Sequence, residues 1–165
     1  MKLYAARNLD AYALLTWALR QQGLFSCPSI ARTPNGKPWF PDCPGQHFSL
    51  SHSGKLCFCA LSDRPVGADI ELIRPRNDSL PRYALTDREY ARYETLGGNW
   101  PAFYTLWTRK EAWCKYTGEG LSGAWGADPR EDGLYYRSYL GADWRAAVCG
   151  EEPPPAEIIW YREAL

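Results

Sequence analysis

The sequence predicts an α+β fold. Three observations support this class: a helical apolar stripe near the N-terminus, a block of strand-like segments in the middle, and a second helical region followed by more strand-like segments. Helices and strands grouped in this order are typical of α+β proteins. The chain has 165 residues, of which 45% are apolar, with eight Trp and eleven Tyr. Its composition is therefore globular, and it is long enough for one compact domain or two small fused halves.

The first predicted element is a helix over residues 9–22, ended by Gly23. Its apolar side chains recur at helical spacing, at Ala11, Leu14, Leu15, Ala18 and Leu19. Charged residues interrupt the run at Arg7, Asp10 and Arg20, so we interpret it as an amphipathic helix and not as a signal sequence. No apolar run in the sequence approaches the ~20 residues that span a bilayer, and we therefore expect no membrane association.

The remaining elements follow from turn residues and periodicity. A loop rich in Pro and Gly covers residues 27–46, and strands are predicted at 47–54, 55–62 and 66–73, with a turn near Ser53 and Gly54. After a basic loop over 74–82, Thr86 begins a helix over 87–97, and Asn99 with Pro101 begins a longer helix that ends at Gly118. Strands are predicted at 133–140, 144–150 and 157–165, with the triple proline 153–155 between the last two.

Charge and cysteine content exclude several classes. The formal net charge is zero and the pI is about 6.7, which disfavours a general nucleic-acid binder. The six cysteines form no CxxC pair and no zinc-like spacing with histidine. Cys57 and Cys59 alternate along an apolar strand, where a free thiol behaves as a small hydrophobe. We therefore expect reduced, buried thiols and a cytoplasmic protein, and a disulfide scaffold is the alternative.

Two acidic residues stand out on the strand at 66–73. Asp69 and Glu71 are two residues apart, so a strand directs both side chains to the same face. Two carboxylates held close together require a positive partner, or else one of them keeps its proton. An ordinary exposed strand face is the alternative explanation.

The long helix offers a third carboxylate. Glu111 and Lys115 are four residues apart and lie on one helix face, one turn after Trp107. Three carboxylates without a histidine ligand suit a hard cation such as Mg²⁺, which takes few carboxylates together with water and substrate phosphate. Lys110 and Lys115 are then expected to contact phosphate. The alternative is a surface ion pair between Glu111 and Lys115, worth only ~0.2–0.5 kcal/mol.

These residues resemble the paired signature of the 4′-phosphopantetheinyl transferases, G-x-D-x-E and W-x-x-K-E-x-x-x-K. The two motifs read here as Gly67-x-Asp69-x-Glu71 and Trp107-x-x-Lys110-Glu111-x-x-x-Lys115. Two further segments resemble the larger, two-subdomain branch that includes the surfactin-synthetase activator, namely Gly36-Lys37-Pro38 and Ser51-His52-Ser53. The order and approximate spacing of all four segments agree, and the resemblance runs from about residue 9 to the end.

The resemblance implies a reaction and a fold. In that family the phosphopantetheine arm of coenzyme A is transferred to a serine hydroxyl of a carrier protein, and adenosine 3′,5′-bisphosphate is released. The implied fold has two similar α/β subdomains related by a pseudo-twofold, with coenzyme A in the cleft between them. We place the subdomains at residues 1–66 and 67–165, with the metal site on the second.

The resemblance also implies residue roles. Asp69, Glu71 and Glu111 would hold Mg²⁺ on the pyrophosphate, and Lys115 would contact phosphate. The nucleotide end of coenzyme A, with its 3′-phosphate, would be contacted by Lys37, Pro38, Ser51 and His52.

The residues do not decide which group accepts the serine proton. Glu89 matches the position of the family's candidate base, but Thr86-x-x-Glu89 is also a capping box, in which the glutamate bonds the cap backbone. A metal-bound water is a further possibility. His52 is alternatively a structural strand histidine. A serine nucleophile at positions 49, 51 or 53 is disfavoured because no G-x-S-x-G elbow is present.

The chain differs from the larger members of the family at its N-terminal end, where they have additional residues before the first helix. Those members usually carry an arginine at the start of that helix, and here Arg7 is the available substitute.

Two other functions compete with the transferase. One is a non-catalytic relative that binds coenzyme A or a carrier protein. The other is a Mg²⁺-dependent nuclease, which the zero net charge and the helical spacing of Glu111 and Lys115 disfavour.

The implied partner is an acidic apo carrier protein. A basic cluster just after the acidic strand can attract it electrostatically, at Arg74, Arg76, Arg82, Arg88 and Arg92. A solvated charged surface is the alternative. We expect a monomer, because two halves already complete one cleft.

Overall fold

The structure is a computed structural model that describes residues 1–120 and 133–162. Its elements in chain order are β1 (Lys2–Arg7), α1 (Ala11–Gln21), β2 (Ala31–Arg32), β3 (Pro38–Trp39), β4 (His47–Ser53), β5 (Leu56–Ser62), β6 (Val66–Leu72), α2 (Leu80–Ala84), α3 (Asp87–Thr95), α4 (Trp100–Thr117), β7 (Tyr135–Leu140), β8 (Trp144–Gly150) and β9 (Ile159–Trp160). The α+β class predicted from the sequence is confirmed.

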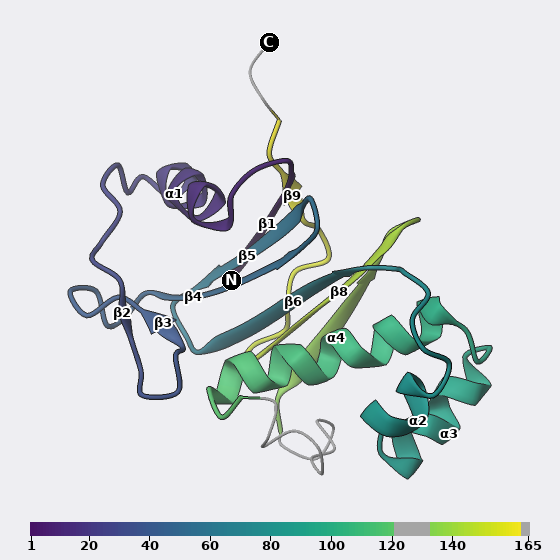
Figure 1. Cartoon of the computed structure of the whole chain (residues 1–165). Coiled ribbons are helices and arrows are strands. Elements are labelled where there is room, and N and C mark those ends of the chain that lie inside the picture. The colour runs from purple at the N-terminus through teal and green to yellow at the C-terminus, as the bar shows by residue number, and fades with distance from the viewer. Residues whose placement is uncertain (121–132, 163–165) are drawn as a thin grey trace.

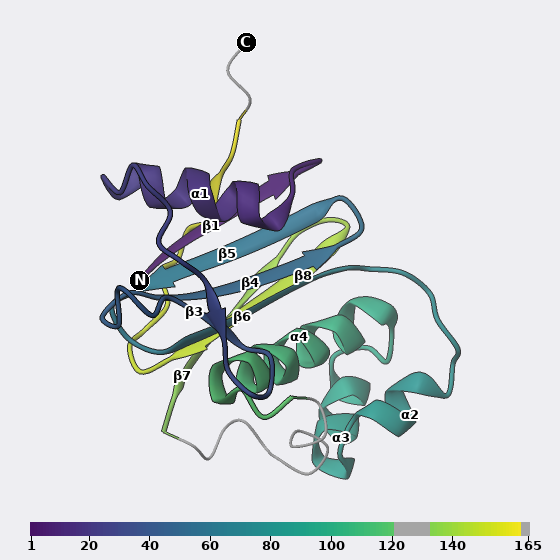
Figure 2. The ribbon, with the colours of Figure 1, turned by 60° about the vertical axis from the view of Figure 1, so that its left-hand side comes forward.

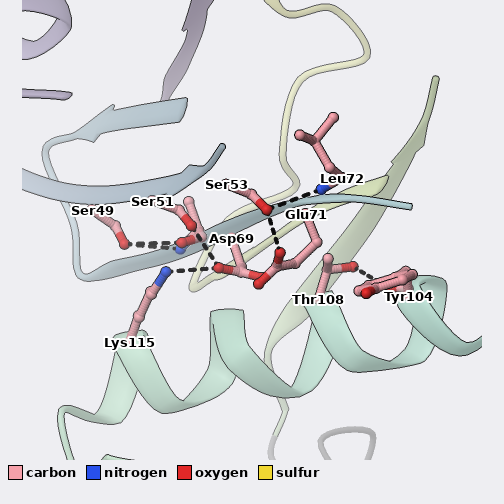
Figure 3. Close-up of polar contacts among 10 residues, drawn as sticks. Ser49, Ser51, Ser53, Asp69, Glu71, Leu72, Tyr104, Thr108 and Lys115 are labelled. Carbon is pink, nitrogen blue, oxygen red and sulfur yellow. Dashed lines mark hydrogen bonds and ion pairs between the residues drawn. The ribbon is translucent and has the colours of Figure 1, made fainter. Parts of the chain in front are cut away.

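The elements stack in four layers (Figures 1 and 2). Within the described residues, one main sheet has the order β4-β5-β1-β9 and the other has the order β6-β8-β7. The two sheets pack face to face around apolar side chains such as Phe58 and Ile70. Helix α1 covers the outer face of the first sheet, and α4 covers the outer face of the second. This stacking leaves the edge strands β4 and β6 of the two sheets side by side (Figure 3).

The two halves share one topology. In the first, β1 leads through α1 to the hairpin β4–β5, and β1 pairs antiparallel with β5. In the second, β6 leads through α4 to the hairpin β7–β8, and β6 pairs antiparallel with β8. This correspondence agrees with the two similar halves that the resemblance implied, although no repeat is visible in the sequence. The boundary between residues 66 and 67 stays a prediction, and β9, near the end of the chain, pairs with β1 of the first half.

The sequence analysis missed several short elements. Strand β1 was not predicted, because its residues form a short run buried on both faces, which periodicity does not distinguish from a helix. The loop predicted over 27–46 contains the two-residue strands β2 and β3, and the loop over 74–82 contains the start of α2. The tail strand predicted over 157–165 is confined to β9, and residues 163–165 lie outside the described part.

The predicted helix ends are confirmed where capping residues specify them. Thr86 caps α3 in a complete capping box, and the Asn99 side chain accepts the Ala102 amide at the start of α4. Gly118 ends α4 in a left-handed conformation, with φ of 74°. No helix in the described part of the chain is both long and apolar enough to cross a membrane.

Candidate active site

The candidate site lies where strand β6 meets helix α4. Because side chains alternate along β6, Ala68 and Ile70 enter the core between the sheets, while Asp69 and Glu71 face α4. Gly67 permits this approach, since a Cβ atom at this position would lie 1.9 Å from the carbonyl oxygen of Ala112. The glycine of the first motif therefore has a packing role: it lets the helix that carries the second motif lie against the strand that carries the first.

The two strand carboxylates are held by donors from different elements (Figure 3). Oδ1 of Asp69 accepts the Ser51 hydroxyl at 2.6 Å and the Lys115 ammonium at 2.7 Å. Oε2 of Glu71 accepts the Ser53 hydroxyl at 2.5 Å. The other oxygen of Asp69, Oδ2, is buried and has no hydrogen-bond partner among the described residues. Such an orphaned buried oxygen is uncommon in folded proteins and calls for an explanation.

Glu111 completes an acidic cluster, which we define as Asp69, Glu71 and Glu111. Burial raises the pKa of the Glu111 carboxyl to about 7, with further contributions from the negative charges of Asp69 and Glu71 and an opposing one from Lys115. Burial also raises the pKa of Glu71, which the Ser53 hydroxyl partly offsets. The negative charges of the three carboxylates thus oppose one another, and the Lys115 ammonium supplies the positive charge that the sequence predicted.

The cluster fits a hard divalent cation in its donor chemistry. Carboxylate oxygens are the ligands that Mg²⁺ uses in proteins, and the buried Asp69 Oδ2 is available to one. Among the residues that the structure describes, no three His, Cys, Asp or Glu side chains are already arranged around one point.

A cavity of about 300 Å³ opens beside the cluster, between the two halves of the chain. The second half contributes Glu111 and Lys115 from α4, and the first half contributes Lys37 and Pro38 from the segment around β3. Apolar contacts in the cavity come from Phe48 and Leu50 of β4. The cavity therefore has charged side chains that suit an anionic group of a ligand, and apolar side chains that suit its uncharged part.

The residues predicted to contact the nucleotide differ in their surroundings. The Lys37 ammonium donates a hydrogen bond to the carbonyl of Tyr116 at the end of α4, and burial lowers the pKa of this lysine. His52 is exposed on β4 and is not among the residues that line the cavity in the described part of the chain. Ser51 is buried, and its hydroxyl binds Asp69. Its contact with the nucleotide stays a prediction.

Lys110 and Glu89 bind each other away from the cavity. Lys110 is only 1% exposed, and its ammonium binds the Glu89 carboxylate at 2.6 Å and the Ala84 carbonyl at 3.1 Å. One helical step from Glu111 is a rotation of about 100°, so Lys110 faces α2 and α3 and not the acidic cluster. Glu89 accepts the Thr86 amide as well. The pair joins three helices, and neither residue lines the cavity in the described part of the chain, so their roles at phosphate and at the reacting hydroxyl stay predictions.

The bonds from Ser51 to Asp69 and from Ser53 to Glu71 were not predicted from the sequence. The available signal was the spacing of Ser49, Ser51 and Ser53, three hydroxyls that a strand directs to one side. Their acceptors lie on β6, about twenty residues later, and only the packing of the two sheets brings them together.

The chain was compared with known proteins. A family profile described as "4'-phosphopantetheinyl transferase superfamily" matches residues 65–151, which include β6, α4 and the acidic cluster. The chain is 30% identical to the 4′-phosphopantetheinyl transferase Sfp of Bacillus subtilis (strain 168), over 79% of this chain and 67% of that protein. It is 33% identical to the 4′-phosphopantetheinyl transferase psf-1 of Bacillus pumilus, over 76% of this chain and 61% of that protein.

The chain belongs to the 4′-phosphopantetheinyl transferase superfamily. The resemblance that the motifs indicated is thereby confirmed, and the Bacillus relatives support its Sfp-like branch. A relative from Salmonella typhi, the 4′-phosphopantetheinyl transferase AcpT, is 38% identical over 61% of this chain and 55% of its own length. The chain spans about two thirds of the length of Sfp and less of psf-1 and AcpT.

Proposed function

We propose that this chain transfers the 4′-phosphopantetheine arm of coenzyme A to a serine hydroxyl of an apo carrier protein. The observation that carries the proposal is the juxtaposition of the acidic cluster with a cavity between the two halves, in a chain of this superfamily. In the reaction, the serine oxygen forms a bond to the phosphorus next to the pantetheine arm. The bond from that phosphorus to the bridging oxygen breaks, and adenosine 3′,5′-bisphosphate leaves.

Asp69, Glu71 and Glu111 would hold a divalent cation, with Mg²⁺ as the proposed ion. When bound, the cation neutralises negative charge on the pyrophosphate oxygens. Lys115 lines the cavity beside Glu111 and would contact a phosphate oxygen. Its present bond to Asp69 leaves about a third of its side chain exposed, at 31%, so the ammonium is accessible from the cavity.

Glu111 is the preferred acceptor of the serine proton. It lines the cavity, whereas the other candidate, Glu89, is committed to Thr86 and Lys110. Lys37 and Pro38 line the opposite wall and remain the proposed contacts for the nucleotide end, with the exposed His52 at its periphery.

The proposed partner is an acidic carrier protein, which would approach exposed arginines near α2 and α3. The exposed basic set consists of Arg74, Arg76, Arg82, Arg88 and Arg92. Positive charge of this kind increases the rate of encounter with an acidic domain. We further propose a monomeric, cytoplasmic enzyme; all six cysteines are free, which agrees with a reducing compartment.

Mass spectrometry of an apo carrier protein tests the proposal. Incubation with the chain, coenzyme A and Mg²⁺ should add about 340 Da to the carrier protein, the mass of one phosphopantetheine. Glu111→Gln should abolish the gain, and Glu157→Gln, at an exposed position, should not. Absence of a gain with several acyl and peptidyl carrier proteins, despite measurable coenzyme A binding, would instead establish a non-catalytic binding protein.

A further inference from the structure

Three serine hydroxyls connect the two halves of the chain. Strands β4 and β6 belong to different sheets, but the bonds between them advance together along both strands, so the strands run in the same direction. Oγ of Ser49 accepts the amide of Ala68 at 2.9 Å, and Oγ of Ser53 accepts the amide of Leu72 at 3.1 Å. Between β4 and β6, these backbone amides thus bond serine hydroxyls instead of backbone carbonyls.

Two of these three serines also bind the acidic cluster. The Ser51 hydroxyl donates to Asp69, and the Ser53 hydroxyl donates to Glu71. Ser49 differs, because its acceptor on β6 is the Ala68 carbonyl, at 3.5 Å. Hydrogen bonds to an ionised carboxylate are roughly twice as strong as those between neutral groups. Ser51 and Ser53 therefore donate to carboxylates of β6, whereas Ser49 donates to a backbone carbonyl.

We propose that Ser51 and Ser53 are positioning residues that orient Asp69 and Glu71 for the divalent cation. This inference rests on the proposed function of the acidic cluster. Because the serines lie on β4 and the carboxylates on β6, the first half of the chain then orients metal ligands that the second half carries, through these two hydrogen bonds.

The geometry supports orientation over simple charge compensation. Rotation about the terminal bond of an aspartate is soft, so a carboxylate without a fixed donor samples many orientations. Ser51 and Lys115 both bind Oδ1 of Asp69, which leaves Oδ2 bare and buried. Lys115 is a flexible side chain that also has phosphate to contact, whereas Ser51 is short and fixed to the strand. Ser51 would thus keep the Asp69 carboxylate in the orientation that directs Oδ2 to the cation when Lys115 binds phosphate.

The experiment is a titration of Mn²⁺, as a probe for Mg²⁺, into the metal-free protein by isothermal calorimetry. The variants are Ser51→Ala and Ser53→Ala. Ser49→Ala is the matched control, because it removes a hydroxyl between the same two strands that binds no carboxylate. Loss of a partner behind a metal ligand typically weakens binding 10–100-fold, so we expect the Kd for Mn²⁺ to rise about 10–100-fold in S51A and S53A. S49A should keep the wild-type Kd, and Ser53→Thr, which retains the hydroxyl, should restore it.

Each outcome decides the inference. Wild-type affinity in S51A and S53A overturns it, and so does an equal loss in all three alanine variants, which would make the serines structural contacts only. If S51A does not fold, the comparison of S53A with S53T decides. If the wild type binds no Mn²⁺, the inference falls together with the metal assignment. The gain in mass of a carrier protein, measured with the wild type, then judges the transferase proposal separately.

Discussion

Replacing Glu111 by glutamine should stabilise the metal-free protein at alkaline pH. The Glu111 carboxyl has an ordinary pKa of 4.5 and a folded-state pKa of about 7. A difference of this size corresponds to roughly 3 kcal/mol when the group is fully ionised. Glu111 is only partly buried, so solvent screening reduces the effect, and we expect about 1–2 kcal/mol at pH 8. For a chain of this length that is about 2–8 °C in Tm.

The dependence on pH has a definite sign. Since the folded pKa of Glu111 is raised, the unfolded chain loses this proton first as the pH rises from 4.5 to 7. The wild type therefore loses the stability that the raised Glu111 pKa contributes over that window, and this contribution is absent from Glu111→Gln. The difference in Tm between variant and wild type should be near zero at pH 4.5 and largest at pH 8.

Addition of Mg²⁺ should reverse the order of the two melting temperatures, so that the wild type has the higher Tm. A cation that binds only the folded state stabilises the wild type by RT ln(1 + [L]/Kd), and the variant lacks one of its proposed ligands. Thermal melts at pH 4.5, 6 and 8, with EDTA or with Mg²⁺, measure both effects, and Glu157→Gln serves as an exposed control. A Tm of Glu111→Gln below that of the wild type in EDTA at pH 8 would refute the electrostatic reasoning. A gain independent of pH would refute it equally.

Three further predictions follow from packing. Gly67→Ala should lower the free energy of unfolding by at least ~1–3 kcal/mol in urea titrations, because its Cβ would meet backbone atoms of α4. Lys110→Met should cost about 3–5 kcal/mol, since it leaves the Glu89 carboxylate buried and unpaired. Titration of the native protein with Ellman's reagent should modify at most two thiols, those of the exposed Cys27 and the half-buried Cys43, and unfolding should release all six.

Specific results would contradict these expectations. Unchanged stability of Gly67→Ala would mean that α4 does not lie against β6 as described. A double variant, Lys110→Met with Glu89→Leu, should recover much of the lost stability because both charges are then removed. If it is no more stable than Lys110→Met alone, the unpaired carboxylate is not the cause. Fewer than six thiols after unfolding without reductant would indicate a disulfide.

Local chemistry in the sequence determined much of this protein. The capping residues Thr86 and Asn99 specified where α3 and α4 begin, because their side chains bond amides within the same turn. Alternation along β6 placed Asp69 and Glu71 on one face, and the four-residue spacing placed Glu111 and Lys115 on one face of α4. These relations depend only on backbone geometry over a few residues, and so the sequence is sufficient for them.

Only the tertiary structure decided which groups meet across the chain. Lys110 is adjacent to Glu111 in sequence but binds Glu89, since one helical step turns it toward α2 and α3. Ser51 binds Asp69 because two sheets pack face to face and bring their edge strands together. Both contacts join residues about twenty positions apart, and their existence depends on how whole layers stack, which no local pattern encodes.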